Sequence, residues 1–521
     1  GKSKPLSVAN QLIKGYNSII PLKESELDIL YYLIAARLCT SVCNSAYSKT
    51  LKPNSEYITI SEKPAWELLR LWVSINPIKA KDTFRSAAGL PPTSKIETNQ
   101  LLERRKRAIS NALSLSYKKP IQMHQSAFQY MYDSYGNTFL DAYNNIMLAG
   151  HSHPKVVQAN QRQSARLNTN TRYLYENLLS YSEKLLATFP KQLNKIFLVN
   201  SGSAASDLAV RLATNHTKRQ KVMVIEHGYH GNTSIGIDIS SYKYNQTGGA
   251  GKQSFIIETA MPKSFNSNYK DDGTAGEHFA SKTQKQILEN TNEIAAFIAE
   301  PIVGCGGQIP LAKGYLKSVY QTLKSQGVVC ISDEVQVGFG RLGDFFWGFE
   351  MHDVIPDMVI VGKPMGNGHP IAAVITNSEI AKSFDNGLEF FSSFGGNPVS
   401  CAIAEAVLDV IQEEGLQQKA KTVGNYLMNA LNNLKTEFKE VADVRGSGLF
   451  IGVEILDQSG NAHTKLAQTI KNSLRENHIL IGTDGPFDNV LKIKPPLSFN
   501  KQNADTVVSA IRKVLLQFEK K

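Results

Sequence analysis

The stretch Met358–Lys363 reads MVIVGK: four apolar residues, a glycine and a lysine. Such a short apolar run is typical of a strand that is buried on both faces. Similar runs lie at 195–200 (KIFLVN), 221–226 (KVMVIE), 295–300 (AAFIAE) and 328–333 (VVCISD), and helical segments separate most of them. Short buried strands that alternate with helices predict an α/β fold with a large, mostly parallel sheet covered by helices on both faces.

Polar residues follow several of these strands at their carboxyl ends, where such sheets bind ligands. Gly202 and Ser203 open a helix whose free N–H groups can hold a phosphate. Tyr229 can lay its ring on a planar ligand, and Asp333 requires a cationic partner such as a protonated pyridine nitrogen. Lys363 leaves an apolar strand, where burial can depress its pKa and favour Schiff-base chemistry. Each feature alone also fits a structural role, but together they form the set that pyridoxal phosphate requires.

The composition is that of a soluble globular protein, with 20% charged and 42% hydrophobic residues in a chain of 521. No uncharged apolar run of about 18 residues and no signal peptide are recognised, so we expect no membrane span. Five cysteines are a sparse and odd number, which predicts reduced thiols and a cytoplasmic location. Most of the net charge of +11 falls in residues 1–120. Without a nucleic-acid-binding motif, a solvated helical surface is the favoured explanation.

The two ends of the chain differ from the middle. Helical spacing predicts helices over 6–50 and 66–75, and Pro91-Pro92 with Ser94 indicates a linker. Cys39 and Cys43 would share one helix face as buried thiols, because no second pair of metal ligands follows; no metal site is predicted. Beyond residue 401, two long helical patterns and strands at 448–455 and 490–493 predict a smaller α+β domain.

Several longer motifs resemble the class III aminotransferases, which have the type I fold of pyridoxal-phosphate enzymes. These motifs are NSGSAASDLAVRLA, YHGNT, DEVQVGFGRLG, PDMVIVGKPMGNGHP and SSFGGNPVSCA. The resemblance covers about residues 101–517. It implies a large cofactor-binding domain at 166–400 and a small domain formed by 93–165 and 401–521. It also implies a homodimer with active sites at the subunit interface and a small-molecule amine as substrate.

The same resemblance assigns roles to individual residues. Lys363 would form the internal aldimine, Asp333 would pair with the pyridine nitrogen and Tyr229 would stack on the ring. The other cofactor-binding residues would be Gly202 and Ser203 at the phosphate, Gln336 at the ring hydroxyl, and His230 and Glu300 beside the ring. Ser393 takes the place of a family threonine and would reach the cofactor phosphate of the second subunit. Ala204 stands where the family has Glu, which alters bonding behind the phosphate turn.

A closer resemblance is to the ethanolamine-phosphate and phosphohydroxylysine phospho-lyases. The segments that carry it are LNTNTRYLYENLLSYSEKLLATFP, DISSYKY, GGQIP and NVLKIKPPLSF. Residues 6–75 resemble the C-terminal helical part of an aminoglycoside-phosphotransferase-like kinase, without its catalytic segment. Residues 1–92 are therefore predicted to be the remnant of such a kinase domain. In the full-length protein, this kinase domain would be fused to the aminotransferase part.

Two reactions remain open for this site. Transaminases of the family commonly pair an acid in the glycine turn with an Arg that binds a substrate carboxylate. Here the turn, EPIVGCGGQIP, has Cys305, and the strand position has Lys492, which is a point charge and not a fork. A phosphate monoester would suit Lys492, and also Arg172, so elimination of phosphate and ammonia is favoured over transamination. Cys305 is not expected to be a catalytic thiol, and a non-catalytic scaffold or nucleic-acid-binding module is the remote alternative.

Overall fold

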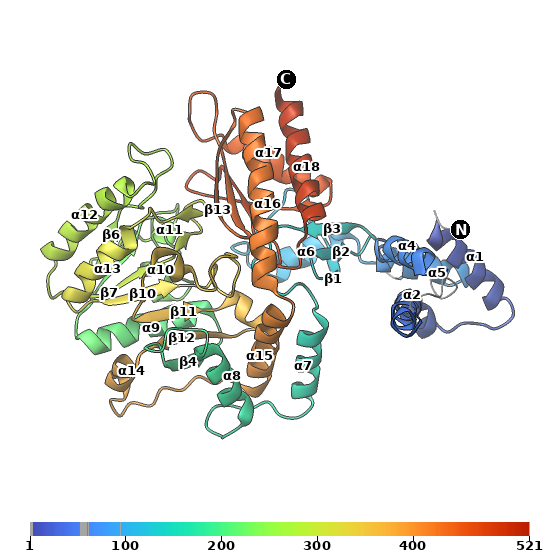
Figure 1. Cartoon of the computed structure of the whole chain (residues 1–521), viewed down its shortest axis with the longest axis horizontal. Helices are drawn as coiled ribbons and strands as arrows, with labels where there is room; N and C mark the ends of the chain where they lie inside the picture. Colours follow the sequence, from blue (N-terminus) through green and yellow to red (C-terminus); the bar gives the residue numbers. More distant parts are fainter. Residues whose placement is uncertain (1–3, 53–59, 61, 94, 520–521) are drawn as a thin grey trace. The chain divides into compact units, whose positions relative to one another are not determined.

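The computed structural model describes residues 4–52, 60, 62–93 and 95–519, so Ser94 of the predicted linker lies outside the described part. The chain forms two compact units (Figure 1). The first consists of Gly1–Ser126 and Tyr130–Phe139, and the second of Ala127–Gln129 and Leu140–Lys521. The domain boundaries predicted at 92, 165 and 400 stay predictions.

The first unit is largely helical, as predicted for residues 6–50 and 66–75. Its helices are α1 (Pro5–Asn17), α2 (Glu24–Leu51), α4 (Glu62–Val73), α5 (Pro77–Ala87) and α6 (Thr98–Ala108). Helix α5 shows why the sequence folds locally in this way. Asn76 caps it, since its Oδ1 accepts hydrogen bonds from the N–H groups of Ile78 (2.9 Å) and Lys79 (3.1 Å), and Pro77 fits the first helical position.

Trp72 is the centre of the helical core. Its ring stacks between Tyr31 and Phe84, with centroid distances of 5.7 and 6.3 Å. The indole N–H donates to the Tyr31 carbonyl at 2.9 Å, which satisfies the one polar atom of a side chain that is 2% exposed. The helices α1, α2, α4 and α5 thus enclose one aromatic cluster.

Helix α2 contradicts the prediction of buried thiols, because Cys39 and Cys43 are both exposed. The helix turns Leu27, Tyr31 and Val42 inward instead. A helix face about 100° wide holds only part of the apolar residues of so apolar a sequence, so the cysteines fall outside it. Within the described ranges, no group of three His, Cys, Asp or Glu side chains is placed to hold a metal ion.

By length and composition alone, α2 could cross a membrane, and 17% of its most apolar window is buried inside the structure. The helix contains no uncharged run of about 18 residues, because Asp28 and Arg37 interrupt its apolar residues. One such helix does not identify a membrane protein, since core helices of soluble proteins meet the same criterion.

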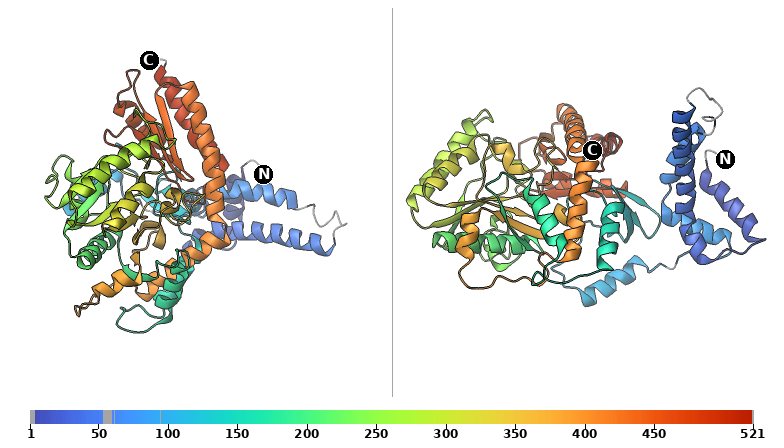
Figure 2. Two further views of the ribbon diagram at one scale, coloured as in Figure 1. Left: turned by 60° about the vertical axis from the view of Figure 1, so that its left-hand side comes forward. Right: turned by 60° about the horizontal axis from the view of Figure 1, so that its bottom comes forward.

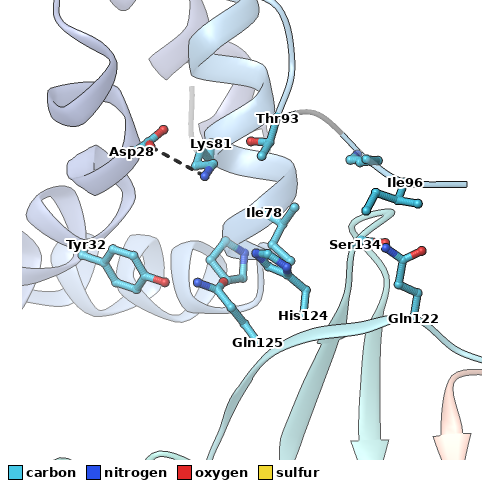
Figure 3. Close-up of a pocket in the computed structure, with 12 residues that line it drawn as sticks. Asp28, Tyr32, Ile78, Lys81, Thr93, Ile96, Gln122, His124, Gln125 and Ser134 are labelled. Atoms are coloured by element: carbon cyan, nitrogen blue, oxygen red, sulfur yellow. Dashed lines mark ion pairs between the residues drawn. The ribbon is translucent and has the colours of Figure 1, made fainter. Parts of the chain in front are cut away.

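A cavity of about 270 Å³ lies within the first unit (Figure 3). Asp28 and Lys81 face one another across its wall at 3.7 Å, as the dashed line in Figure 3 marks. Lys95, also in the wall, pairs with Asp82 at 2.9 Å. The lysines of this cavity therefore have carboxylate partners.

Three short strands follow the helices: β1 (Met123–Ala127), β2 (Tyr130–Asp133) and β3 (Thr138–Asp141). Asp133 shapes the turn after β2, because its carboxylate accepts from the N–H groups of Tyr135 (3.0 Å) and Asn137 (2.7 Å). The last two residues of β3 belong to the second unit, where Leu140 and Asp141 pair in parallel with β15 (Ile479–Leu480).

The second unit is built on a seven-stranded sheet with the order β4-β12-β11-β10-β7-β5-β6. Its strands are β4 (Lys195–Val199), β5 (Lys221–Ile225), β6 (Ile256–Thr259), β7 (Ile294–Ala299), β10 (Val329–Asp333), β11 (Met358–Val361) and β12 (Ala372–Thr376). Only β12 runs against its neighbours. The five apolar runs of the sequence all become strands of this sheet, which confirms the predicted mostly parallel α/β fold.

The two faces of the sheet are covered by different helices, as strand alternation requires. Ala296 and Ile298 of β7 join the core cluster that contains α9 (Gly202–Thr217). Phe297, between them, contacts Tyr320 of α13 (Tyr315–Ser325), which packs beside α12 (Thr274–Glu289). Figure 1 shows α9 and α13 on opposite sides of the strands.

Shorter elements complete this part of the unit. They are α7 (Pro154–Ser164), α8 (Glu176–Leu186), α10 (Ser234–Asp238), α11 (Ser241–Tyr244), β8 (Ile302–Val303), β9 (Ile309–Pro310), the 3-10 turns η1 (Gly348–His352) and η2 (Lys363–Gly366), α14 (Ser378–Phe384) and α15 (Pro398–Glu413). Helix α15 packs against α7 and α8.

The C-terminal part contains a second sheet, which is antiparallel, and the strands predicted at 448–455 and 490–493 belong to it. Its order is β13-β14-β17-β16, and its elements are α16 (Leu416–Glu437), β13 (Val441–Ser447), β14 (Phe450–Ile455), α17 (Thr464–Glu476), β16 (Gly482–Asp484), β17 (Val490–Ile493) and α18 (Lys501–Glu519). Helices α16 and α18 run side by side (Figures 1 and 2).

The aromatic stack predicts where the first unit is most sensitive to mutation. Trp72→Ala should destabilise it by about 3–5 kcal/mol, because the substitution leaves a large cavity. Trp66→Ala, on the same helix but 42% exposed, is the matched control and should have little effect. Hydrogen exchange measured by mass spectrometry should show faster exchange in α2, α4 and α5 for Trp72→Ala only. Equal protection in both variants would contradict the assignment of Trp72 to the core.

Candidate active site

A cavity of about 140 Å³ lies where the strands of the large sheet end. Its wall is formed by residues that follow β4, β5, β10 and β11: Gly202, Ser203, Ser206, Tyr229, His230, Gly231, Asp333, Val335, Gln336 and Lys363. Seven of the predicted site residues therefore share one cavity. Sequence positions up to 161 residues apart meet here because the parallel strands present their carboxyl ends at one edge.

The start of α9 forms one end of the cavity. Ser201 caps this helix, because its Oγ accepts a hydrogen bond from the Ala204 N–H at 3.2 Å. The N–H groups of a first helical turn have no intrahelical acceptor, which makes them donors for a phosphate. Gly231 approaches this turn closely: with φ at +134°, a Cβ there would lie 2.9 Å from the Ser203 Cα. The glycine thus permits the loop after β5 to close over the helix start.

Asp333 ends the central strand β10 as a buried carboxylate. Its Oδ2 lies 2.7 Å from Nδ1 of His230, and its Oδ1 accepts from the Val335 N–H at 3.1 Å. The two side chains are 5% and 0% exposed. His230 therefore supports the aspartate from the side away from bulk water, and the carboxylate remains part of the cavity wall.

Glu334, the next residue, has a structural role. Its carboxylate accepts hydrogen bonds from the N–H groups of Gly348 (2.6 Å) and Phe349 (2.8 Å), at the start of η1. Burial raises its pKa to about 7, although these bonds favour the charged form. Successive residues of a strand point in opposite directions, which separates the two adjacent acids.

Lys363 follows β11 directly and has a backbone φ of +29°, an unusual left-handed conformation for a residue with a side chain. Burial lowers the pKa of its amine, while Asp333 and Glu300 act in the opposite direction. A lowered pKa increases the fraction of neutral amine, which is the form that acts as nucleophile and base.

Glu300 ties several parts of the wall together. Its Oε1 accepts from the Tyr229 N–H (3.1 Å), and its Oε2 accepts from the Gly304 N–H (3.2 Å) and from Nε2 of Gln336 (3.3 Å). The side chain is buried, and this burial raises the pKa of Glu300 to about 7, with Asp333 contributing in the same direction. The carboxyl group thus connects Tyr229 to the glycine turn.

Two residues that the sequence did not single out also contact Gln336. The Nδ2 of Asn145 and the Nζ of Lys494 both donate to its Oε1, at 3.0 and 3.1 Å. Lys494 is fully buried, and its Nζ lies 3.7 Å from the centroid of the Phe450 ring. Burial lowers the pKa of Lys494 well below its usual value. A signal was present, because two lysines spaced two apart in LKIKPP fall on one strand face.

Lys492 and Cys305 lie beside this network. Burial opposes the charge of Lys492, but Asp484 at 2.9 Å outweighs it and raises the lysine pKa. Burial and the nearby Asp484 raise the pKa of the Cys305 thiol to about 12, so this cysteine is protonated at neutral pH. The prediction that Cys305 is no catalytic thiol agrees with this environment.

Arg172 and Ser393 are not among the residues that line the cavity in the described part of the chain. Arg172 pairs with Glu389 at 2.9 Å, and its guanidinium lies 4.1 Å from the centroid of the Phe391 ring. Ser393 is exposed on the same segment that carries Phe391. Their predicted roles stay predictions.

The donor set of the cavity fits pyridoxal phosphate. A helix start, an aromatic ring, a buried carboxylate and a lysine face one space, and Oγ of Ser206 and Nε2 of His230 are buried polar atoms without a hydrogen-bond partner in the described structure. Gly202, Ser203, Tyr229, Asp333 and Lys363 would hold the cofactor. Fold and site together define a pyridoxal-phosphate enzyme of the type I fold.

Comparison with known proteins gives the family. Residues 114–515 match the model of the family described as aminotransferase class-III. The chain is 44% identical to "Alanine--glyoxylate aminotransferase 2-like" of Drosophila melanogaster (81% of this chain, 87% of the relative). It is 36% identical to "Ethanolamine-phosphate phospho-lyase homolog 1" of Caenorhabditis elegans (80% and 93%). Among solved structures, it resembles a phospholyase from Arthrobacter in complex with phosphoethanolamine (TM-score 0.76, 35% identity, 80% and 99% covered).

The chain therefore belongs to the class III aminotransferase family, and it is a pyridoxal-phosphate-dependent enzyme. This excludes the remote alternative of a non-catalytic scaffold or nucleic-acid-binding module as its main function.

The raised pKa of Glu300 gives a pH-dependent prediction for the cofactor-free protein. The folded-state pKa of about 7 exceeds the ordinary 4.5, so folding favours the protonated acid. The resulting stability is present below pH 4.5 and is lost as the pH rises through 7, by at most about 3 kcal/mol. Glu300→Gln does not titrate, so its thermal unfolding midpoint should rise relative to wild type between pH 5 and 8. A difference that stays constant over this range would show that Glu300 does not titrate there.

Proposed function

We propose that the enzyme is a phospho-lyase, which eliminates phosphate and ammonia from a phosphorylated amino alcohol. The observation that carries this proposal is the position of Lys492 near Cys305, because a lysine and a neutral thiol replace the Arg and acid typical of carboxylate-binding relatives. Lys492 is partly buried and kept charged by Asp484, and it is close enough to Lys363 to lower the pKa of that amine.

The partly buried positive charge of Lys492 near Lys363 favours substrates with a compact anionic group. Lysine acts as a point charge, which suits the tetrahedral phosphate at least as well as the planar carboxylate that an arginine fork recognises. Asp484 is shared with Nε2 of Gln308, at 3.0 Å, so Lys492 has only part of this carboxylate to itself. An incoming phosphate would therefore find an incompletely neutralised cation.

The residues of the cavity would divide the reaction between them. Bound pyridoxal phosphate supplies an electron sink for the pair released when a C–H bond breaks. Lys363 would remove the proton from the amine-bearing carbon as general base. Asp333, held by His230, would face the ring nitrogen. The C–O bond to phosphate would then break on the adjacent carbon, with Lys492 stabilising the departing charge, and water would release ammonia and an aldehyde.

The relatives support this substrate class. The Arthrobacter phospholyase was solved with phosphoethanolamine, and the Caenorhabditis relative has a phospho-lyase name. Phosphoethanolamine is accordingly the first substrate to test.

Transamination is the second candidate, and the relative with 44% identity carries an aminotransferase name. In that reaction Lys363 would return the same proton to the cofactor side, and a keto acid would be needed as acceptor. Both reactions use the same residues around the cofactor, so the acceptor requirement separates them.

Proteins with the class III fold are typically dimers that act on small molecules. We propose a homodimer with shared active sites, in which Arg172 and Ser393 lie toward the cavity of a second copy. Both residues are exposed, and the exposed apolar side chains of Leu174 and Phe394 are close to them in the sequence. A cytoplasmic location without membrane or nucleic-acid partners, and fusion to a kinase domain in a longer chain, belong to the same proposal.

Product analysis tests the reaction type. Purified enzyme with phosphoethanolamine and no keto acid should release phosphate and ammonia in equal amounts over many turnovers. A reaction that stops after one turnover and resumes on addition of pyruvate or glyoxylate would identify a transaminase instead. Lys363→Ala should abolish either activity and serves as the blank.

Lys492→Met tests the binding of the phosphate. We expect KM for phosphoethanolamine to rise at least about tenfold, because a charge-assisted contact is lost. The affinity for pyridoxal phosphate should change little. Lys471→Met is the matched control, since this half-buried lysine lies on α17, and its Nζ is 3.4 Å from Oγ1 of Thr483 on β16. An unchanged KM in Lys492→Met would place the phosphate elsewhere.

A further inference from the structure

Gln336 is held more firmly than a residue that only fills the wall of a cavity. Three side chains contact its amide: Asn145 and Lys494 at Oε1, and Glu300 at Nε2. The backbone of Gly304 encloses it as well, because a Cβ at that position would lie 2.7 Å from Nε2. A glycine there leaves room for the amide, and the contacts determine its orientation.

The contacts of the Gln336 amide leave one of its hydrogens without a partner among the described residues. The Oε1 atom has two acceptor positions, and Asn145 and Lys494 occupy both. The Nε2 atom has two hydrogens, of which one goes to Glu300. Since Gln336 lines the cavity, the second N–H is the one available to a bound group. That group must present an acceptor oxygen.

We infer that Lys494 is a positioning residue, which acts through Gln336 by directing the N–H of its amide into the cofactor cavity. A flipped amide would place Nε2 against the two donors Asn145 and Lys494 and Oε1 against the carboxyl group of Glu300. The lysine makes this flip unfavourable when it is protonated, because an ammonium group has no acceptor for the hydrogens of Nε2. The ring hydroxyl oxygen of the cofactor is the acceptor we expect at the free N–H.

The surroundings of Lys494 fit a residue with this single task. Its side chain is fully buried, so its amine is not open to a substrate from solvent. The Phe450 ring lies beneath the amine. The charged and titratable groups that face it are Lys492, Asp484, Cys305 and Glu300. Burial of a lysine amine is energetically costly. The hydrogen bond to Oε1 of Gln336 partly offsets this cost and gives the amine a defined role.

This role does not depend on whether the reaction is elimination or transamination. It differs from the role of Lys492, which is proposed to meet the substrate. The two lysines therefore predict different phenotypes: Lys492→Met changes KM for the substrate, and Lys494→Met changes the properties of the bound cofactor.

The test is a double-mutant cycle on the holoenzyme with Lys494→Met, Gln336→Leu and the combination of both. Two quantities are measured: the dissociation constant of pyridoxal phosphate, and the pH midpoint of the change in its visible absorption. Without Lys494, the Gln336 N–H is no longer held toward the anionic ring oxygen of the cofactor. Loss of that hydrogen bond favours the protonated form of the bound cofactor, so the pH midpoint should rise by about one unit in Lys494→Met. The cofactor should bind about tenfold more weakly.

In the Gln336→Leu background, Lys494→Met should add little to either quantity, because its effect passes through the amide. Asn145→Ala removes the other hydrogen bond to Oε1 of Gln336 and should shift the pH midpoint in the same direction. Because Asn145 is less buried than Lys494, this variant is a second test with a smaller risk of misfolding. Lys471→Met should leave the midpoint where it is in wild type. Effects of Lys494→Met that are equal with and without Gln336, or an unchanged midpoint, would overturn the inference.

Discussion

The buried pair of His230 and Asp333 is the interaction on which the rest of the site depends. A carboxylate that is 5% exposed at the end of a central strand is unfavourable without a partner, and His230 supplies one at 2.7 Å. The strand β10 lies in the middle of the sheet, between β7 and β11, so the aspartate cannot withdraw without disturbing the core. Its position then defines where a cationic ring nitrogen would be favourable.

The remaining polar groups are arranged around this point in layers. Glu300 contacts Tyr229, the glycine turn and Gln336, and Lys494 and Asn145 donate to Gln336 from its other end. Few of these groups reach bulk water, so each hydrogen bond is stronger and each missing one is more costly than at the surface. Such a network fixes the side chains of the site before a cofactor binds, so little reorganisation is needed on binding.

Much of the fold was predictable because buried parallel strands have a simple pattern. The apolar runs before Asp333 and Lys363 are strands in the structure, and the polar residues after them meet in one cavity. Strand β12 was missed because its alanines have low strand propensity. Burial of Cys39 and Cys43 was predicted wrongly, since spacing shows that residues share a helix face but not whether that face is covered.

The site was less predictable where its contacts join distant segments. Lys494 directly follows β17 of the small sheet, 158 positions from Gln336. Nothing in the spacing LKIKPP shows which of its two lysines turns toward Asp484 and which toward an amide. The ion pair between Arg172 and Glu389 was unpredictable for a similar reason, because Glu389 lies in a loop whose sequence has no regular pattern. Local sequence predicts strands and strand ends, whereas these pairings depend on how whole elements pack.

The antiparallel strand β12 has a consequence for how the molecule acquires its shape. The edge strand β4, which is followed by helix α9 at the cavity, has β12 as its one neighbour in the sheet, and Val199 pairs with Ala372, 173 positions later. Closing so long a loop is slow in terms of chain entropy. During synthesis on the ribosome, β4 gains its sheet neighbour only when the chain has reached β12. The cavity is therefore a late product of folding, and nascent chains that end before residue 372 have no sheet neighbour for the strand that begins it.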